Sequence, residues 1–287
     1  MPIAAVNGTE LYYETTGRGE PLLLIPGLGM GADYFQYAIP YLAASCRVIS
    51  LDLRGIGRSA KPDERYSVET WADDVAALLE YLGESSAHIV GASLGGCIAM
   101  ALVDRHRSRV KSMELIAAFS DLDYALELNW RLRKTIVTES GMGAAIQDHV
   151  TLWTLGHRFL ETERGQHVAG QIRRGISSND PKMYLAFLEA ILDFGCVTPA
   201  TAGRSTYTER LRDVRVPTLL VAGAQDILTP PVLSERVAAA MPPGCAEVAI
   251  IPDSGHITMV EVPEENSRLI IDFVQRVVTS SEDFAGQ

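Results

Sequence analysis

Residues 88–100 read HIVGASLGGCIAM, a stretch that places one polar side chain, Ser93, between two apolar runs. The run before Ser93 is short and continuous, as in a buried strand, and the run after it has the length of a helix. Glycines stand two residues before and two residues after the serine, at Gly91 and Gly95. In a sharp strand-to-helix turn, a Cβ at either place would collide with the adjoining strand or helix. The stretch therefore predicts a serine hydroxyl raised above the edge of a sheet.

The rest of the chain alternates between apolar runs and helical patterns, which predicts an α/β fold. Asn7-Gly8 separates the first two runs and is typical of a tight hairpin turn, while the later runs are nearly continuously apolar and fit strands buried on both faces. Alternation of strands and helices favours a mostly parallel sheet flanked by helices, here with an antiparallel N-terminal edge. The eight expected strands are residues 3–6, 9–15, 21–26, 47–53, 87–91, 110–118, 216–223 and 246–252.

Residues 120–205 interrupt the alternation, because they contain helix signals and no convincing strand. One helix is expected to begin at Asp180-Pro181 and to end at Gly195, which are typical start and stop signals. We therefore expect an inserted helical cap at 120–205 and a core made of residues 1–119 and 206–287.

Composition excludes several classes of function. The chain of 287 residues has a formal net charge of −11, so it lacks the basic footprint of a nucleic-acid-binding protein. Its four cysteines are scattered without paired spacing, which argues against a metal site or a disulfide framework and favours a reducing compartment. No apolar run approaches the roughly 18 residues of a membrane span. We expect a cytoplasmic protein that does not bind membranes. The sequence does not decide the oligomeric state, and a homo-oligomer is possible.

Gly91-Ala-Ser93-Leu-Gly95 fits the G-x-S-x-G pattern of a nucleophile elbow, and its strand-to-helix context is the one that this motif requires. The beginning of the following helix favours negative charge, and the backbone N–H of Leu94 is aimed at the place where an oxyanion would form. Ser93 is therefore the candidate nucleophile.

The chain resembles the α/β-hydrolase superfamily over almost its whole length, on the elbow and on the segments VPTLLVAGAQD and AIIPDSGH. The resemblance implies the α/β-hydrolase fold and a triad in the order nucleophile, acid, histidine, which selects Asp226 and His256. A histidine with an ordinary pKa near 6.5 can take the serine proton at neutral pH. Asp121 and Asp123, which follow an earlier strand, are the competing acid positions.

The resemblance also implies a second oxyanion donor in Pro26-Gly27-Leu28-Gly29, namely the backbone N–H of Leu28. Gly27 would let the chain turn close to the substrate. Many relatives have His-Gly where this chain has Pro-Gly, which puts the support of this turn in doubt. The segment DLRGIGRS at 52–59 also matches a family pattern, and we interpret it as a brace for a loop.

These features together predict a cofactor-independent serine hydrolase of small to medium, mainly apolar carboxylic esters or lactones, with no metal. The motifs are most similar to those of enol-lactonases and carboxylesterases. Carbon-carbon bond hydrolysis or perhydrolysis on the same triad is one alternative, and a non-catalytic receptor for a small molecule is another. Aromatic residues of the expected cap either line the pocket or pack the cap helices together: Tyr124, Trp130, Trp153, Phe159 and Phe187.

Overall fold

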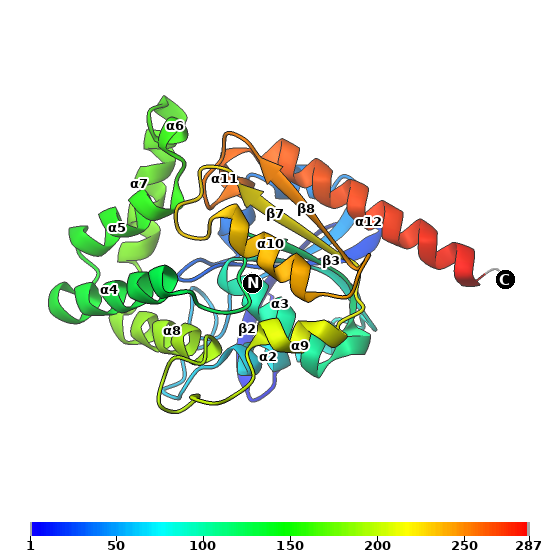
Figure 1. Ribbon diagram of the computed structural model, residues 1–287, viewed down its shortest axis with the longest axis horizontal. Helices are drawn as coiled ribbons and strands as arrows, with labels where there is room; N and C mark the ends of the chain where they lie inside the picture. Colours follow the sequence, from blue (N-terminus) through cyan, green and yellow to red (C-terminus); the bar gives the residue numbers. More distant parts are fainter. Residues whose placement is uncertain (1, 286–287) are drawn as a thin grey trace.

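The computed structural model describes residues 2–285, with side chains through residue 280, and its centre is one eight-stranded sheet (Figure 1). The strand order is β1-β2-β4-β3-β5-β6-β7-β8. The β1–β2 and β2–β4 pairs are antiparallel, and the other pairs are parallel, as predicted. The strands are β1 (Ile3–Val6), β2 (Thr9–Gly17), β3 (Glu20–Ile25), β4 (Cys46–Leu51), β5 (Ala87–Ala92), β6 (Val110–Ile116), β7 (Thr218–Gly223) and β8 (Ala246–Ile251).

The burial of the strands follows their place in the sheet. Both Asn7 and Gly8 have positive φ angles, 45° and 71°, which confirms the predicted hairpin turn. Strands β5 and β7 are buried at every residue, as expected for central parallel strands. The expectation that β8 is buried on both faces was wrong, because Val248 and Ile250 are exposed. Strand β8 is an edge strand with β7 as its neighbour, so its apolar run is only partly covered.

Helices cover the sheet in two groups. Helices α2, α3, α9 and α10 contact one another in succession and lie in front of the sheet in Figure 1, whereas α1 and α12 contact each other. The Ser67 hydroxyl accepts a hydrogen bond from the Thr70 N–H, 3.0 Å, and so caps α2. These helices are α1 (Ile39–Leu42), α2 (Val68–Tyr81), α3 (Leu94–Arg105), α9 (Tyr207–Arg210), α10 (Pro231–Ala240) and α12 (Pro263–Ala285), with the short α11 (Thr258–Glu261) before α12.

Between β6 and β7 the chain forms a group of helices beyond the carboxyl ends of the strands. Figure 1 shows this group on the side toward which the arrowheads of β7 and β8 point. Asp180 accepts hydrogen bonds from the first N–H groups of α8, and Gly195 follows its last residue, so both predicted boundaries are confirmed. The members are α4 (Tyr124–Ser140), α5 (Ala144–Thr154), α6 (His157–Leu160), α7 (Glu163–Ser177) and α8 (Pro181–Phe194), which we call the α4–α8 segment.

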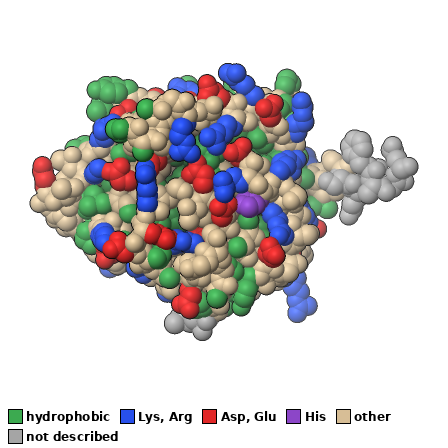
Figure 2. Space-filling view, turned by 90° about the horizontal axis from the view of Figure 1, so that it is seen from below, with side chains coloured by type: hydrophobic (Ala, Val, Ile, Leu, Met, Phe, Trp, Pro, Cys, Tyr) green, Lys and Arg blue, Asp and Glu red, His purple; other side chains and the backbone are tan. Residues whose placement is uncertain are grey.

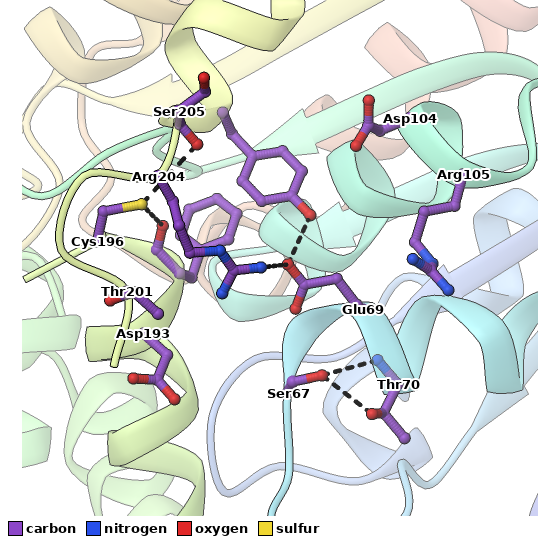
Figure 3. A network of polar contacts seen from close by, with 12 residues as sticks. Ser67, Glu69, Thr70, Asp104, Arg105, Asp193, Cys196, Thr201, Arg204 and Ser205 are labelled. Carbon is purple, nitrogen blue, oxygen red and sulfur yellow. Dashed lines mark hydrogen bonds and ion pairs between the residues drawn. The ribbon is translucent and has the colours of Figure 1, made fainter. Parts of the chain in front are cut away.

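Polar contacts fasten the chain where it returns from the α4–α8 segment to the sheet (Figure 3). The Tyr207 hydroxyl donates to Glu69 Oε1 of α2, 3.1 Å, and Arg204 pairs with the same oxygen at 3.9 Å. The Arg204–Glu69 pair is half-exposed, so it stabilises the fold little. The returning chain is therefore held mainly by the buried ring of Tyr207, which stacks on Phe194 at the end of α8.

The surface carries mixed charge. Acidic and basic side chains are interspersed over the face seen in Figure 2, without a continuous basic patch on that face. No helix in the described part of the chain is both long and apolar enough to cross a membrane.

Candidate active site

Ser93 lies between the end of β5 and the beginning of α3, in a strained backbone conformation. Its φ of 52° and ψ of −113° belong to a region that L-residues rarely adopt. Its N–H donates to the carbonyl oxygen of Ile116 in β6, 2.8 Å, which holds the turn in place. A Cβ on Gly91 would overlap the Gly95 carbonyl, and one on Gly95 would overlap the Ile25 carbonyl. The two glycines are therefore required by close backbone contacts, as the sequence predicts.

His256 and Asp226 meet at the carboxyl ends of β8 and β7. His256 Nδ1 lies 2.9 Å from Asp226 Oδ2, and both side chains are buried. Asp226 Oδ1 accepts from the N–H groups of Leu228 and Thr229 at 2.8 and 2.9 Å. Because two main-chain donors bind the other oxygen, the carboxylate is fixed with Oδ2 facing the imidazole. A donor N–H on Nδ1 leaves Nε2 free to accept a proton.

Thr229 completes the support of this pair and was not anticipated from the sequence. Its hydroxyl lies 2.7 Å from Asp226 Oδ2, 2.9 Å from His256 Nδ1 and 3.0 Å from the Ala117 carbonyl. A single hydroxyl proton can serve only one of these acceptors, while the oxygen can accept from Nδ1. The turn in which Asp226 accepts from the N–H groups of Leu228 and Thr229 brings this hydroxyl next to the carboxylate.

The two competing acids are engaged elsewhere. Asp121 accepts from Arg236 and from the Thr208 hydroxyl, at 3.1 and 2.9 Å. Asp123 caps α4 by accepting from the N–H of Leu126, 2.9 Å. Neither carboxylate bonds to His256, so Asp226 is the carboxylate that contacts the imidazole.

The loop after β3 lies directly against Ser93. A Cβ on Gly27 would stand 3.6 Å from the Ser93 Cβ, an ordinary van der Waals contact, so the loop passes directly beside the serine while space alone does not require glycine here. The next residue, Leu28, borders the same cavity as Ser93. Leu94 is the first residue of α3, where a backbone N–H lacks a partner within the helix. Leu28 thus borders the cavity, and Leu94 follows the serine directly in the chain.

The cavity at Ser93 is small, about 30 Å³, and combines sheet loops with the α4–α8 segment. Pockets that hold a drug-sized ligand usually have about 300 Å³ or more. A substrate of that size would therefore have to displace side chains of the α4–α8 segment. The lining residues are Gly27, Leu28, Met30, Tyr34, Ala92, Ser93, Trp130, Arg133, Val150, Thr154, Leu228, His256 and Ile257.

The aromatic residues of the α4–α8 segment have different surroundings. Trp130 borders the cavity. Trp153 does not; it stacks on His149, with ring centroids 5.7 Å apart. Phe187 is buried against Trp71, 4.5 Å between centroids, and packs the segment onto α2. Tyr124 is exposed, and Arg164 lies over the ring of Phe159. Of Trp130, Trp153 and Phe187, the three possible lining residues of the sequence, Trp130 borders the cavity, and Trp153 and Phe187 make packing contacts, which was the other alternative.

Residues 52–59 brace loops, as we interpret the motif. Asp52 accepts from the Ala32 N–H and from Arg58, 2.7 and 2.8 Å. Arg54 binds Asp74 of α2 in a buried pair, at 2.9 and 2.6 Å. None of these side chains borders the cavity at Ser93.

Two further polar side chains near His256 were missed, because nothing in their local sequence distinguishes them. Glu261 in α11 accepts from the N–H of Gly255, next to His256, and from the N–H of Gly156, at 3.0 and 3.1 Å. Burial raises the pKa of Glu261 to about 7. Glu261 thereby joins the histidine loop to the α4–α8 segment. The other residue is Arg133, which borders the cavity from α4.

Comparison with known proteins agrees with this geometry. The family model of the alpha/beta hydrolase fold matches residues 20–263. A protein of Azorhizobium caulinodans classed as the carbamate hydrolase RutD is 32% identical over 279 residues, 95% of this chain and 98% of that protein. An esterase from Thermogutta terrifontis, solved with bound malate, has a TM-score of 0.82 at 28% identity and covers 94% of both chains.

A second solved structure, the enol-lactonase from Burkholderia xenovorans, has a TM-score of 0.83 at 26% identity, over 96% of this chain and all of that one (100%). The match of the family model extends from β3 to the beginning of α12 and includes Ser93, Asp226 and His256. The chain therefore belongs to the alpha/beta hydrolase fold family.

Proposed function

We propose that this chain is a cofactor-independent serine hydrolase that cleaves carboxylic esters or lactones. The observation that carries the proposal is the fixed His256–Asp226 pair, 2.9 Å apart, whose histidine borders the same cavity as the strained Ser93. Family membership supports hydrolysis in general, and the similarity to an esterase and an enol-lactonase favours ester and lactone bonds.

In the first step the Ser93 Oγ attacks the carbonyl carbon. A carbon–oxygen bond forms, the carbonyl electron pair moves to oxygen, and His256 Nε2 takes the hydroxyl proton. Asp226 stabilises the resulting imidazolium through Nδ1 and keeps the ring in the required tautomer.

The negative oxygen of this intermediate would lie between the N–H groups of Leu28 and Leu94. The N-terminus of α3 adds its partial positive charge at the same point. Each donor of this kind contributes about 3 kcal/mol to stabilising the transition state. This chain has Pro26-Gly27 where many relatives have His-Gly. Because both oxyanion donors are main-chain N–H groups, this difference does not remove their ability to donate hydrogen bonds.

The intermediate then collapses. The bond to the alkoxide breaks, the alkoxide takes the proton from His256, and an acyl-serine remains. Water, deprotonated by His256, attacks the acyl group and releases the acid as Ser93 regains its proton. With a lactone the alcohol stays attached to the acyl chain, so one hydroxy acid is the product.

Carbamate hydrolysis is a second candidate, favoured by the 32% identity to the protein classed as a carbamate hydrolase. The same serine attack would apply to a carbamate carbonyl. Carbon-carbon bond hydrolysis and perhydrolysis also use this triad, and a receptor would bind without turnover.

An activity panel tests the proposal: p-nitrophenyl esters from acetate to decanoate, aliphatic and enol lactones, and p-nitrophenyl N-alkylcarbamates. We expect turnover of esters or lactones and an acyl adduct on Ser93 in intact-mass spectra taken during turnover. Ser93→Ala should abolish both, whereas Ser177→Ala, which alters an exposed hydroxyl at the end of α7, should change neither. Turnover of carbamates alone would favour the second candidate, and no turnover by the wild-type chain would favour a receptor.

A further inference from the structure

Arg133 is a buried cation without a counter-ion. It lies in α4 with 3% of its surface exposed, and its Nε and Nη2 atoms have no hydrogen-bond partner in the described part of the chain. No carboxylate among the residues with described side chains forms an ion pair with it. A buried charge without a partner is strongly destabilising, so a fold does not keep one without cause.

The two partnerless nitrogens form a specific recognition edge. Nε and Nη2 carry the two N–H groups that point in parallel along one side of the guanidinium plane. This edge matches the two oxygens of a carboxylate and binds them through two parallel hydrogen bonds. Arg133 therefore presents a bidentate donor edge whose Nε and Nη2 atoms have no well-aligned acceptor among the described residues, although the Tyr184 hydroxyl interacts with the guanidinium from beside it.

Other polar groups around Arg133 also lack partners. Within the described part of the chain they are Trp130 Nε1, His149 Nε2 and both side-chain polar atoms of Asn129. The guanidinium carbon lies 4.6 Å from the ring centre of Trp130, a cation–π contact that holds the side chain but uses none of its N–H groups. Natural proteins rarely leave several buried polar groups unsatisfied in one place, so this cluster indicates a missing ligand.

The charges in the cluster favour a single negative charge on that ligand. Burial, followed by the positive charge of Arg133, lowers the pKa of His149 to about 4, so His149 is neutral at pH 7. Burial lowers the pKa of Arg133 itself, and the adjacent Tyr184 hydroxyl opposes this shift. Arg133 is then the one cation of the cluster. A carboxylate neutralises it, whereas a phosphate dianion would leave a buried negative charge.

Arg133 and Trp130 border the same cavity as Ser93 and His256. We propose that this cluster, centred on Arg133, is a recess for a carboxylate of the substrate, so that the enzyme prefers esters or lactones that carry a second, free carboxylate. The inference rests on the proposed hydrolase function and adds the substrate class to it. Arg133 is a binding residue in this scheme: it orients the anion and takes no part in proton transfer.

Matched pairs of substrates test the recess. On the acyl side the pair is mono-p-nitrophenyl adipate and its methyl ester; on the alcohol side it is 4-acetoxybenzoate and methyl 4-acetoxybenzoate. We expect the wild-type kcat/KM to favour the carboxylate member of one pair by about 10- to 100-fold, the usual effect of a hydrogen bond between charged groups. The preference should change little with salt, because a buried ion pair is screened much less than an exposed one.

Arg133→Met keeps an unbranched apolar stem and removes the guanidinium with its charge. It should lower kcat/KM for the carboxylate substrate by about 10- to 100-fold more than for the neutral member, mainly through KM. Arg133→Lys should restore part of the preference, since it returns the charge without the bidentate edge. Arg131→Met, which removes an exposed arginine from the same helix, is the control. Unliganded Arg133→Met should melt at a higher temperature than the wild type, because an unpaired buried charge is gone.

A binding measurement separates this proposal from the proposed function. Ser93→Ala cannot form an acyl-enzyme, yet 10 mM adipate should raise its melting temperature by a few degrees and dimethyl adipate should not. Adding Arg133→Met should remove that shift. A wild-type preference for both neutral esters, or a carboxylate preference that persists in Arg133→Met, would overturn the recess. If neither esters nor lactones are cleaved, the hydrolase proposal fails, and the melting shift with adipate still decides whether the recess binds a carboxylate.

Discussion

At the scale of single residues, the site consists of side chains whose positions are set by main-chain bonds. The hydroxyl of Ser93 is presented by a positive φ, and Asp226 is held by two consecutive turn N–H groups. Because these bonds already fix the groups, little conformational freedom is lost when a transition state forms. This is the basis of preorganised catalysis.

From the sequence alone, Asp121 and Asp123 compete with Asp226 for the role of the acid in the triad. Mutation distinguishes these candidates. Asp226→Asn should lower kcat by on the order of a thousandfold or more, because the amide favours the wrong histidine tautomer. Asp121→Asn should change kcat by less than about threefold, since Asp121 binds Arg236 and Thr208. Steady-state kinetics on one p-nitrophenyl ester measures both. A large loss in Asp121→Asn with a small loss in Asp226→Asn would contradict the assignment.

At the scale of elements, the strand-to-helix turn from β5 to α3 depends on the absence of side chains. Gly95 is in the first turn of α3, and its hypothetical Cβ meets the main chain of Ile25, which cannot rotate away. A helix elsewhere in the chain offers a comparison, because Gly175 in α7 has open space around its position.

We expect Gly95→Ala to destabilise the protein by about 2 kcal/mol or more and to lower kcat/KM, because β3 and α3 must separate. Gly175→Ala should instead stabilise the protein by about 0.5–1 kcal/mol, as alanine favours an open helical position. Urea denaturation of both variants checks the pair. Equal stability of the two would show that the contact between Gly95 and β3 does not constrain the turn.

The sequence predicts these elements well where the signal is local and poorly where it depends on distant chain segments. The Asn7-Gly8 hairpin and the Asp180-Pro181 start were recognisable because each is decided by neighbours in sequence. The exposed face of β8 was not recognisable, because an apolar run has the same sequence pattern at the centre and at the edge of a sheet. Likewise Phe187 reads as an apolar helix residue whether it faces α2 or a pocket.

The same distinction applies to the candidate site. Ser93, Asp226 and His256 follow from a motif and its order along the chain, so their positions could be predicted. Arg133 follows from no motif, because its significance lies in what surrounds it: buried polar groups of α4 and α5 without a hydrogen-bond partner among the described residues. Only the folded arrangement of these helices makes that visible.

At the scale of the whole molecule, a buried carboxyl in the sheet gives stability a pH dependence that is separate from the site. Glu114 in β6 is fully buried and accepts from the Ser112 hydroxyl, 2.5 Å, while its Oε2 has no partner in the described chain. Burial raises the pKa of Glu114 to about 8 from an ordinary 4.5. Because the folded state binds this proton more tightly than the unfolded state, the contribution to stability is largest below pH 4.5 and is lost as pH rises to about 8.

Glu114→Gln cannot ionise at this position. Between pH 6 and pH 9 we therefore expect the free energy of unfolding to fall in both proteins, but by about 2–3 kcal/mol more in the wild type than in Glu114→Gln. Urea denaturation at both pH values measures the difference. Glu265→Gln, an exposed change with the same loss of charge, should behave as the wild type. An identical pH dependence in Glu114→Gln and the wild type would show that Glu114 is not the titrating group.

The central claim is that Ser93 is an activated nucleophile, and covalent labelling by a fluorophosphonate tests it without knowledge of the substrate. Intact-mass spectra and peptide mapping should show one adduct per chain, on Ser93, in the wild type and in Ser177→Ala, and none in Ser93→Ala. Asp226→Asn should label far more slowly. Failure of the wild type to react, or equal labelling of Ser93→Ala, would contradict the account.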